Sequence, residues 1–459
     1  MASDDSSILL VVEKLEVVLV KPSKPTPDVS LSLSTIDNNP SYETIVKTIC
    51  VFAPNPNLKD QAMVSLLQHG LSQALFYYYP LAGKLHRKSE DNRLELNYKA
   101  GDGVPFIKAS ATCTLSSLSY LEGTDHFDAS YQLVPCYEPV KDYDPLALQV
   151  TKFACGGMAI GMAHAHAVCD GVGVAQFFRA MIDLAFGRKT QPTVIPVWNR
   201  ERLTFDNIND ELGDDNKKPE LVELRKPQSS IATSPYKITH DLVREILNIT
   251  WEDITKLKNI IAENKSKTNE HEKLEVDATT LEVLAAHIWR ARSRALKLNP
   301  EGTTVLGLGV GIRSIMEPPL PEGYYGNAVV PALVALTARE LSKSPLSRVV
   351  RLIKDMKREA LDKRYVLGKL SEMETRIKVM AWPNRIGIET MLLSDWRQIG
   401  LQYDGLVNII PLISMTRPFI CVLLPASKAD PGMSGGVRLV VTLPREAMAK
   451  FKEEMQNAF

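Results

Sequence analysis

The residues best placed to do chemistry lie in one short segment, where a histidine precedes an aspartate by four positions. It reads His164-Ala-His166-Ala-Val-Cys-Asp170-Gly171-Val-Gly173. His166 falls where a predicted strand ends, and a histidine fixed there is a good general base because its unperturbed pKa lies near neutrality. Asp170 falls where a helix is predicted to begin. It can fix the loop that presents the ring by accepting helix N–H groups or by pairing with an arginine.

Spacing alone leaves this chemistry open. A structural role for both residues is the commoner explanation of an isolated His-x-x-x-Asp pattern, although none of the other histidines has an aspartate four positions later. His164 falls on the same strand face as His166 by alternation. We interpret His164 as a residue that packs the core or supports the site from behind His166, not as a second base.

The elements that position this segment are predicted to be a hairpin and a helix. Residues 146–154 and 158–165 alternate as strands around Gly156-Gly157, and residues 170–186 form an amphipathic helix. Elsewhere the patterns predict strands at 15–20 and 304–311 and helices at 59–78, 251–263, 279–298 and 345–364. Ser344 is the expected N-cap of the last helix.

The chain is predicted to form two domains, because 459 residues exceed what one core usually organises. A polar, proline-broken stretch at 205–238 is the expected crossover between an N-terminal domain (1–204) and a C-terminal domain (239–459). Strand and helix patterns mix on both sides of it. We therefore predict α/β sandwiches in both halves.

Composition argues against several classes of protein. Lys and Arg total 54 against 54 Asp and Glu, so no net positive field favours nucleic acid. No secretory signal and no run long enough to span a membrane is found, and six dispersed cysteines favour a cytoplasmic location. No metal site is expected. Gly307, Gly309 and Gly311 do not form a dinucleotide fingerprint, because Ile312 occupies the third glycine position.

Ordered blocks along nearly the whole chain resemble the plant BAHD acyl-CoA-dependent acyltransferases. His166 to Gly171 matches the HxxxDG signature of that family. The other matching blocks are the LSxxD-like Leu33–Asp37, the YPLAGRL-like Tyr79–Leu85, Pro196–Glu201, Thr279–Arg292, and Arg313 followed by Pro318–Asn327.

The resemblance implies a fold of two chloramphenicol-acetyltransferase-like domains with a channel between them. It also implies acyl-CoA as a co-substrate, no tightly bound cofactor, and a small-molecule acceptor. His166 would deprotonate the acceptor, and Asp170, paired with Arg313, would orient the loop. Thr279 and Thr280 lie in a block that helps to form the family's CoA side. We expect a monomer.

One block departs from the family. A DFGWG motif should follow residues 394–397, but the chain continues Gln398-Ile-Gly-Leu-Gln-Tyr403-Asp-Gly-Leu. When residues 407–411 are kept in register with the family pattern, about five residues are missing before them. Tyr403 falls near the position of the family's tryptophan. We consider two hypotheses: the phenol replaces the indole N–H as a polar group near the oxyanion, or Tyr403 only packs the shortened loop.

Three functions remain in view. The blocks favour an acyl-CoA-dependent O-acyltransferase that acts on the hydroxyl of an apolar plant metabolite, as in the benzyl alcohol benzoyltransferase and taxane acyltransferase branch. An N-acyltransferase acting on an amine would use the same histidine. The missing DFGWG motif also leaves a non-catalytic binding protein as an alternative.

Overall fold

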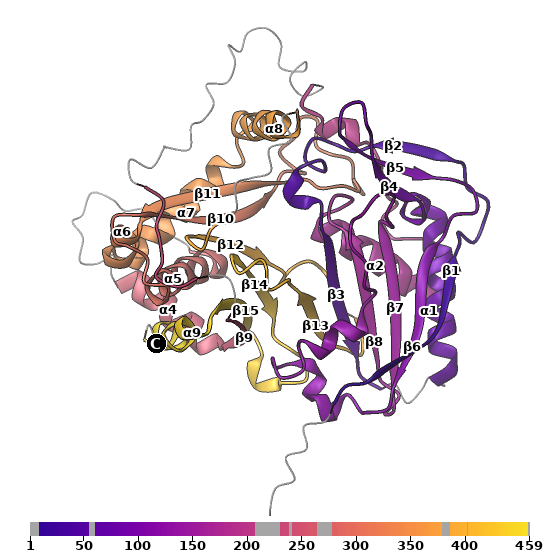
Figure 1. Ribbon diagram of the computed structural model, residues 1–459, viewed down its shortest axis with the longest axis horizontal. Coiled ribbons are helices and arrows are strands. Elements are labelled where there is room, and N and C mark those ends of the chain that lie inside the picture. Colours follow the sequence, from indigo (N-terminus) through magenta and orange to yellow (C-terminus); the bar gives the residue numbers. More distant parts are fainter. Residues whose placement is uncertain are drawn as a thin grey trace, which may run out of the picture.

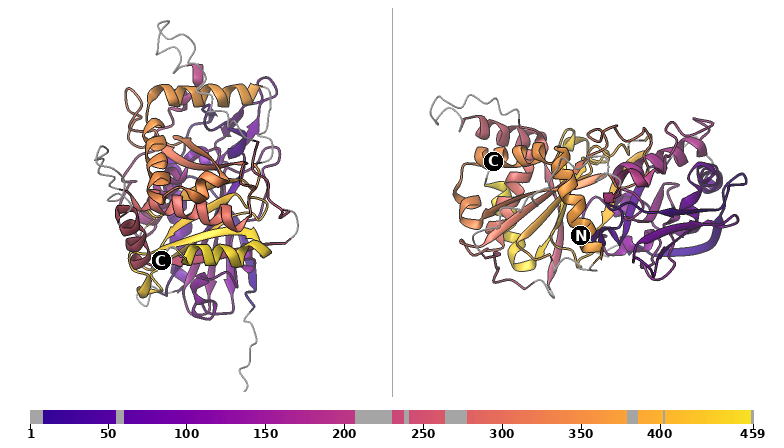
Figure 2. Two further views of the ribbon diagram at one scale, coloured as in Figure 1. Left: turned by 90° about the vertical axis from the view of Figure 1, so that its left-hand side faces the viewer. Right: turned by 90° about the horizontal axis from the view of Figure 1, so that it is seen from above.

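The structure of the protein is a computed structural model that describes residues 9–54, 60–206, 230–237, 241–263, 278–378, 386–401 and 403–457. Two halves lie side by side in it, one formed mainly by the first 200 residues and the other mainly by the rest (Figures 1 and 2). A sheet lies within each half. Short 3-10 helices connect some elements: η1 (Pro40–Tyr42), η2 (Tyr79–Ala82), η3 (Ser116–Leu121), η4 (Ala129–Leu133), η5 (Arg200–Leu203) and η6 (Pro431–Met433).

The N-terminal half is built on a sheet whose described strands follow the order β1-β6-β7-β8-β3-β13. Helices α1 and α2 pack on each other and share a buried apolar core with this sheet. A smaller sheet, β2-β5-β4, lies beside it. The bounds are β1 (Val12–Val20), β2 (Val29–Ser32), β3 (Ile45–Phe52), α1 (Asp60–Tyr77), β4 (Lys84–Arg87), β5 (Leu94–Tyr98), β6 (Val104–Ala111), β7 (Leu146–Phe153), β8 (Met158–Ala165), α2 (Gly171–Ala185) and β13 (Leu406–Leu412).

The C-terminal half contains a second sheet, in the described order β11-β10-β12-β14-β15-β9. Helices α4, α5, α7 and α9 bury their apolar faces against it, and α8 packs on a neighbouring cluster. The bounds are β9 (Leu242–Ile249), α4 (Trp251–Glu263), α5 (Thr280–Ala295), β10 (Thr303–Gly311), β11 (Val329–Thr337), α6 (Ala338–Lys343), α7 (Leu346–Glu359), α8 (Lys363–Lys378), β12 (Thr390–Asp395), β14 (Ile420–Pro425), β15 (Val437–Pro444) and α9 (Arg445–Gln456).

The hairpin that leads to the histidine motif forms as predicted. Strands β7 and β8 pair in antiparallel register, with Leu146 opposite His164, and every residue of β8 is buried. Gly161 in β8 is required by packing, since a Cβ there would lie 1.9 Å from the carbonyl oxygen of Leu133. The strand that precedes His166 is therefore hydrogen-bonded along both edges, to β7 and β3, and closely packed at Gly161.

Strand β13 does not follow the predicted division of the chain. It lies within 239–459 by position, but it pairs with β3 in the first sheet, where Leu412 is opposite Lys47 (Figure 1). An apolar strand at this position covers an edge of β3 that would otherwise leave backbone groups unpaired. The boundary at 205–238 thus separates stretches of sequence, not two sheets, and residues 207–229 and 238–240 lie outside the described residues.

The prediction of one helix at 345–364 was wrong about both its N-cap and its end. Ser344 does not cap it: Pro345 occupies the N-cap position, while the backbone N–H of Ser344 closes α6 by donating to Glu340. The helix also ends at Glu359. A second helix, α8, starts at Lys363, where Asp362 accepts the N–H of Arg364 and interrupts the apolar periodicity.

His287 in α5 predicts a loss of stability in acid. It is 4% exposed and contacts the carbonyl of Met455 at 3.1 Å, and burial lowers its pKa from 6.5 to about 4. The unfolded chain therefore binds this proton more readily, and stability falls as pH drops from 6.5 towards 4. The loss from this residue is on the order of 3 kcal/mol. In urea unfolding at pH 7 and pH 4, His287→Gln should lose less stability than the wild type, whereas the exposed His69→Gln should match the wild type.

Among the described residues, no helix combines the length and apolar character that crossing a membrane requires.

Candidate active site

His166 lies one residue beyond β8 and is held by its own backbone. Its N–H donates to the carbonyl of Thr44 at 2.9 Å, and its carbonyl accepts the side-chain amide of Asn327 at 2.8 Å. Tyr42 of η1 stacks on the imidazole, with ring centroids 4.4 Å apart and planes 8° from parallel. The residue is partly exposed although its Nδ1 is buried, so its accessible part lies away from Nδ1.

Asp170 begins α2 and joins the two halves of the molecule. One carboxylate oxygen accepts the N–H groups of Val172 and Gly173, which makes Asp170 the N-cap. The carboxylate also forms a two-point ion pair with Arg313, at 2.8 and 3.0 Å, and accepts the N–H of Ala328 at 3.1 Å. The pairing with Arg313 that the resemblance implied is therefore present, and it fixes the end of the histidine loop.

A second buried ion pair holds the middle of the loop. Asp37 accepts from Arg200 at 2.5 Å and from both the backbone and the side-chain amide of Asn327, at 2.9 and 2.8 Å. Arg200 also donates to the carbonyl of Val168 at 2.7 Å. Residues that are distant in the sequence thus hold the loop by hydrogen bonds at His166, Val168 and Asp170.

Asp37→Ala should be strongly destabilising. Asp37 and Arg200 are 0% and 2% exposed, and removal of one partner of such a pair leaves a buried charge that typically costs about 3–5 kcal/mol. Denaturant unfolding measures this loss. The matched control is Asp241→Ala, which breaks an exposed pair with Arg445 and should cost under about 1 kcal/mol. Equal losses in the two variants would contradict the role given to the buried pair.

The surroundings of His166 favour the neutral imidazole. Burial lowers its pKa below the ordinary 6.5, and the charge of Arg417 lowers it further, whereas Asp170 and Asn327 act in the opposite direction. A neutral imidazole at physiological pH can accept a proton. The geometry and the pKa both suit a general base.

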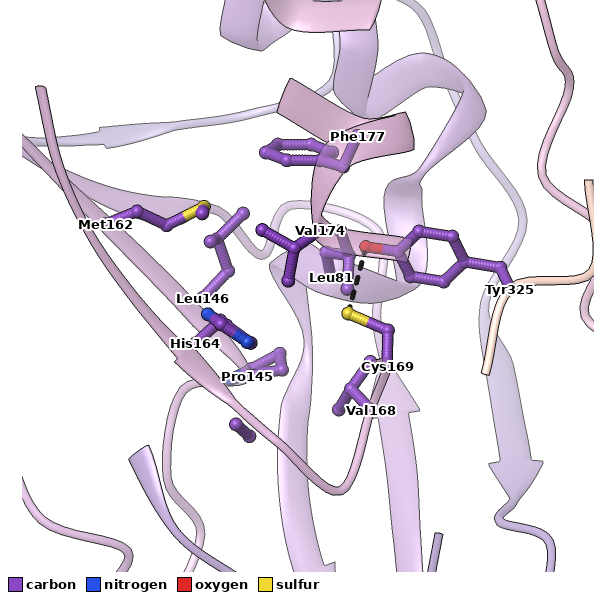
Figure 3. Close-up of a pocket in the computed structure, with 11 residues that line it drawn as sticks. Leu81, Pro145, Leu146, Met162, His164, Val168, Cys169, Val174, Phe177 and Tyr325 are labelled. Atoms are coloured by element: carbon purple, nitrogen blue, oxygen red, sulfur yellow. Dashed lines mark hydrogen bonds between the residues drawn. The ribbon is translucent and has the colours of Figure 1, made fainter. Parts of the chain in front are cut away.

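A small cavity lies beside the loop, and His164 lines it while His166 does not (Figure 3). Its volume of about 10 Å³ is close to what one water molecule needs. Cys169 and Tyr325 also line it and contact each other at 3.6 Å. Burial, and after it an electrostatic effect of the neighbouring His166, lower the pKa of His164 to about 3, which supports a packing role. A Cβ at Gly173 would lie 2.6 Å from that of Cys169, so glycine is needed there.

The residues predicted on the CoA side lie apart from this cluster. Thr279 is the N-cap of α5 and forms a reciprocal capping box with Glu282, which also binds Lys357. Thr280 is the first residue of the helix. Their contacts are those of a stable helix start, and their role as CoA ligands stays a prediction. Among the described residues, no cluster of three or more His, Cys, Asp or Glu side chains could hold a metal ion.

Tyr403 packs against α2. Its ring meets that of Phe178 edge-on at 5.7 Å, and its buried hydroxyl interacts with the side chain of Arg179, also in α2. This placement supports the packing hypothesis over the oxyanion hypothesis. Tyr403→Phe should keep the turnover of the wild type at saturating substrates, because the ring contact with Phe178 is retained. A large fall in kcat, measured by steady-state kinetics, would contradict the packing role.

No role was predicted for Tyr42, Arg200 or Asn327 from the sequence. Arg200 and Asn327 lie inside blocks that were recognised by resemblance, but only the folded chain brings them to the histidine loop. Of the glycines of β10, Gly307 is covered by Leu392 and Leu333, whereas nothing lies within 4 Å of a Cβ at Gly311. One face of this strand is therefore open only near its end.

Sequence comparisons find relatives over nearly the whole chain. The family model described as "Transferase family" matches residues 10–458. The spermidine coumaroyl-CoA acyltransferase of Arabidopsis thaliana is 45% identical and covers 99% of this chain and 97% of its own length. The spermidine sinapoyl-CoA acyltransferase of the same plant is 43% identical over 98% of each chain. The taxadien-5-alpha-ol O-acetyltransferase of Taxus chinensis is 28% identical over 96% of this chain and 95% of its own length.

Solved structures share the fold. Vinorine synthase has a TM-score of 0.69 at 21% identity, covering 98% of both chains. TRI101 of F. sporotrichioides, solved with coenzyme A and T-2, has a TM-score of 0.74 at 17% identity, covering 94% of this chain and 98% of its own. These likenesses confirm the predicted α/β fold class of two-domain coenzyme-A-dependent acyltransferases.

Proposed function

Because the chain belongs to the Transferase family of plant BAHD acyltransferases, which use acyl-CoA as co-substrate, we propose that it transfers a hydroxycinnamoyl group to an amino group of a polyamine such as spermidine. The observation that carries this proposal is the identity of 45% and 43% to two spermidine acyltransferases over nearly the whole chain. The proposed acceptor is therefore an amine, whereas the sequence patterns alone favoured an alcohol.

The site supplies the chemistry that this reaction needs. His166 accepts a proton from the attacking amine, the C–N bond forms at the thioester carbon, and the C–S bond breaks. The thiolate of coenzyme A leaves and takes the proton from His166 as CoASH. Asp170 and Arg313 hold the loop so that the imidazole meets the acceptor, and no covalent acyl-enzyme is required.

The test is acyl transfer with matched donors and acceptors. The purified protein is given coumaroyl-CoA or sinapoyl-CoA with either spermidine or an alcohol such as benzyl alcohol, and free thiol and products are measured. Amide formed with spermidine, absent in His166→Ala, supports the proposal. Ester formed only with the alcohol would favour O-acylation, the reaction named for the taxadien-5-alpha-ol O-acetyltransferase relative. No thiol release with any pair would favour a binding protein.

A further inference from the structure

The loop of residues 413–419 begins at the end of the sheet that carries His166. Strand β13 runs antiparallel to β3 and its last pair is Leu412 with Lys47. Two residues further along β3, Ile45 pairs with Ala165, and the carbonyl of Thr44 accepts the N–H of His166. The chain that continues from β13 therefore leaves the sheet at the same end as the histidine loop.

Hydrogen bonds give this loop a fixed shape. The carbonyl of Ile413 accepts from the guanidinium of Arg244 and from the hydroxyl of Tyr131. Within the loop, the N–H of Arg417 donates to Ser414 at 3.0 Å, and its carbonyl accepts the N–H of Ile420 at 3.1 Å. Arg417 is therefore presented from a structured turn.

Arg417 is a positive charge without a protein counter-charge. It is partly buried, and in the part of the chain that the structure describes no carboxylate lies within 4.0 Å of it. A desolvated guanidinium is unfavourable unless an anion joins it, and it keeps its charge at all physiological pH values. The charge of Arg417 also acts, after burial, to lower the pKa of His166.

Among the described residues that interact with His166, no other supplies a free positive charge. Tyr42 covers one ring face, and His164 lies on the same strand with a pKa of about 3. Asp170 and Asn327 face the loop from the N-terminus of α2 and from the start of β11, and Asp170 is already paired with Arg313. Tyr403, the alternative donor suggested by the sequence, packs on α2.

We propose that Arg417 is a catalytic residue whose guanidinium meets the negative charge that develops on the thioester carbonyl oxygen during attack. The proposal deepens the acyl transfer proposed above and rests on it. Bond changes are unaltered: the new bond forms at carbon, the C–S bond breaks, the proton passes through His166 to the thiolate, and Arg417 keeps its own protons. A fixed cation placed where charge appears needs no reorganisation during the reaction.

The experiment compares Arg417→Gln and Arg417→Lys with the wild type. Arg417→Gln should lower kcat about 10²–10³-fold, as expected on loss of one oxyanion donor, with little change in KM for the acyl-CoA. Arg417→Lys, which keeps the charge, should retain more activity. The matched control is Arg445→Gln, an exposed arginine paired with Asp241 whose loss should leave kinetics unchanged. An unchanged kcat, or a change in KM alone, would overturn the proposal.

A readout without substrate separates this inference from the proposed acceptor. The imidazole of His166 is titrated by NMR in the wild type and in Arg417→Gln, where removal of the cation should raise its pKa; no rise would overturn the placement of Arg417. If the wild type acylates alcohols but not polyamines, the proposed acceptor fails, and the kinetic test of Arg417 is run on the alcohol. If no acceptor releases thiol, both proposals fail.

Discussion

Replacing His166 with alanine is expected to lower kcat by about 10²–10⁴-fold, the range that a positioned general base contributes. The imidazole lies one residue beyond β8, and burial lowers its pKa, which favours the neutral form that can accept a proton. Steady-state release of coenzyme A thiol measures the effect. The variant should still fold, because the loop is held through the backbone of His166 and through Asn327, not through the ring.

The pH dependence of the wild type provides the control. Because the pKa of His166 is lowered, kcat should fall only below the ordinary imidazole value of 6.5. An alcohol acceptor, which does not ionise in this range, isolates the histidine from the amine. Turnover of His166→Ala close to that of the wild type, in protein shown to be folded, would remove the base from the mechanism.

Loss of Asp170 should reduce both stability and turnover. Asp170→Ala removes the N-cap of α2 and leaves Arg313 without its partner; the cap alone is typically worth about 1 kcal/mol. Release of the loop should also lower kcat, since the ring is no longer held. Asp170→Asn should retain part of the cap and lose the ion pair, so it should fall between alanine and the wild type.

A double-mutant cycle checks that Asp170 acts together with Arg313. Asp170→Asn, Arg313→Gln and the double variant are compared in unfolding free energy and in kcat. If the pair acts as a unit, the double variant should be less impaired than the sum of the single variants, with a coupling of about 0.5–3 kcal/mol. Strictly additive effects would contradict the orienting role.

The sequence predicts those parts of the site that are local in the chain. The hairpin, the helix that follows it and the capping aspartate lie within some forty consecutive residues, and their periodicities and turn residues are strong. The partner Arg313 came from the family resemblance, not from spacing. The gap of 143 positions between it and Asp170 carries no local pattern.

What the sequence could not predict depends on pairing at long range. Asp37 and Asn327 are 290 positions apart, and the apolar run of β13 does not indicate which sheet it joins. The predicted end of the helix was wrong because a single polar side chain ends it. Asp362 separates α7 from α8, although the composition of the whole stretch favours helix. A role for Arg417 could not be predicted either, because the mixed composition of residues 413–419 does not indicate that this loop follows a strand of the first sheet.

The course of β13 also restricts how substrates can reach the histidine. Because this strand is hydrogen-bonded to β3, whereas β12 before it and β14 after it in the chain belong to the second sheet, the chain passes between the halves again on each side of β13. A motion that opens the two halves would therefore have to bend the chain before and after β13 as well as at the crossover, so a single hinge is not enough. The reactants should therefore thread in and out past side chains, and release of the bulky product should depend on local breathing of loops.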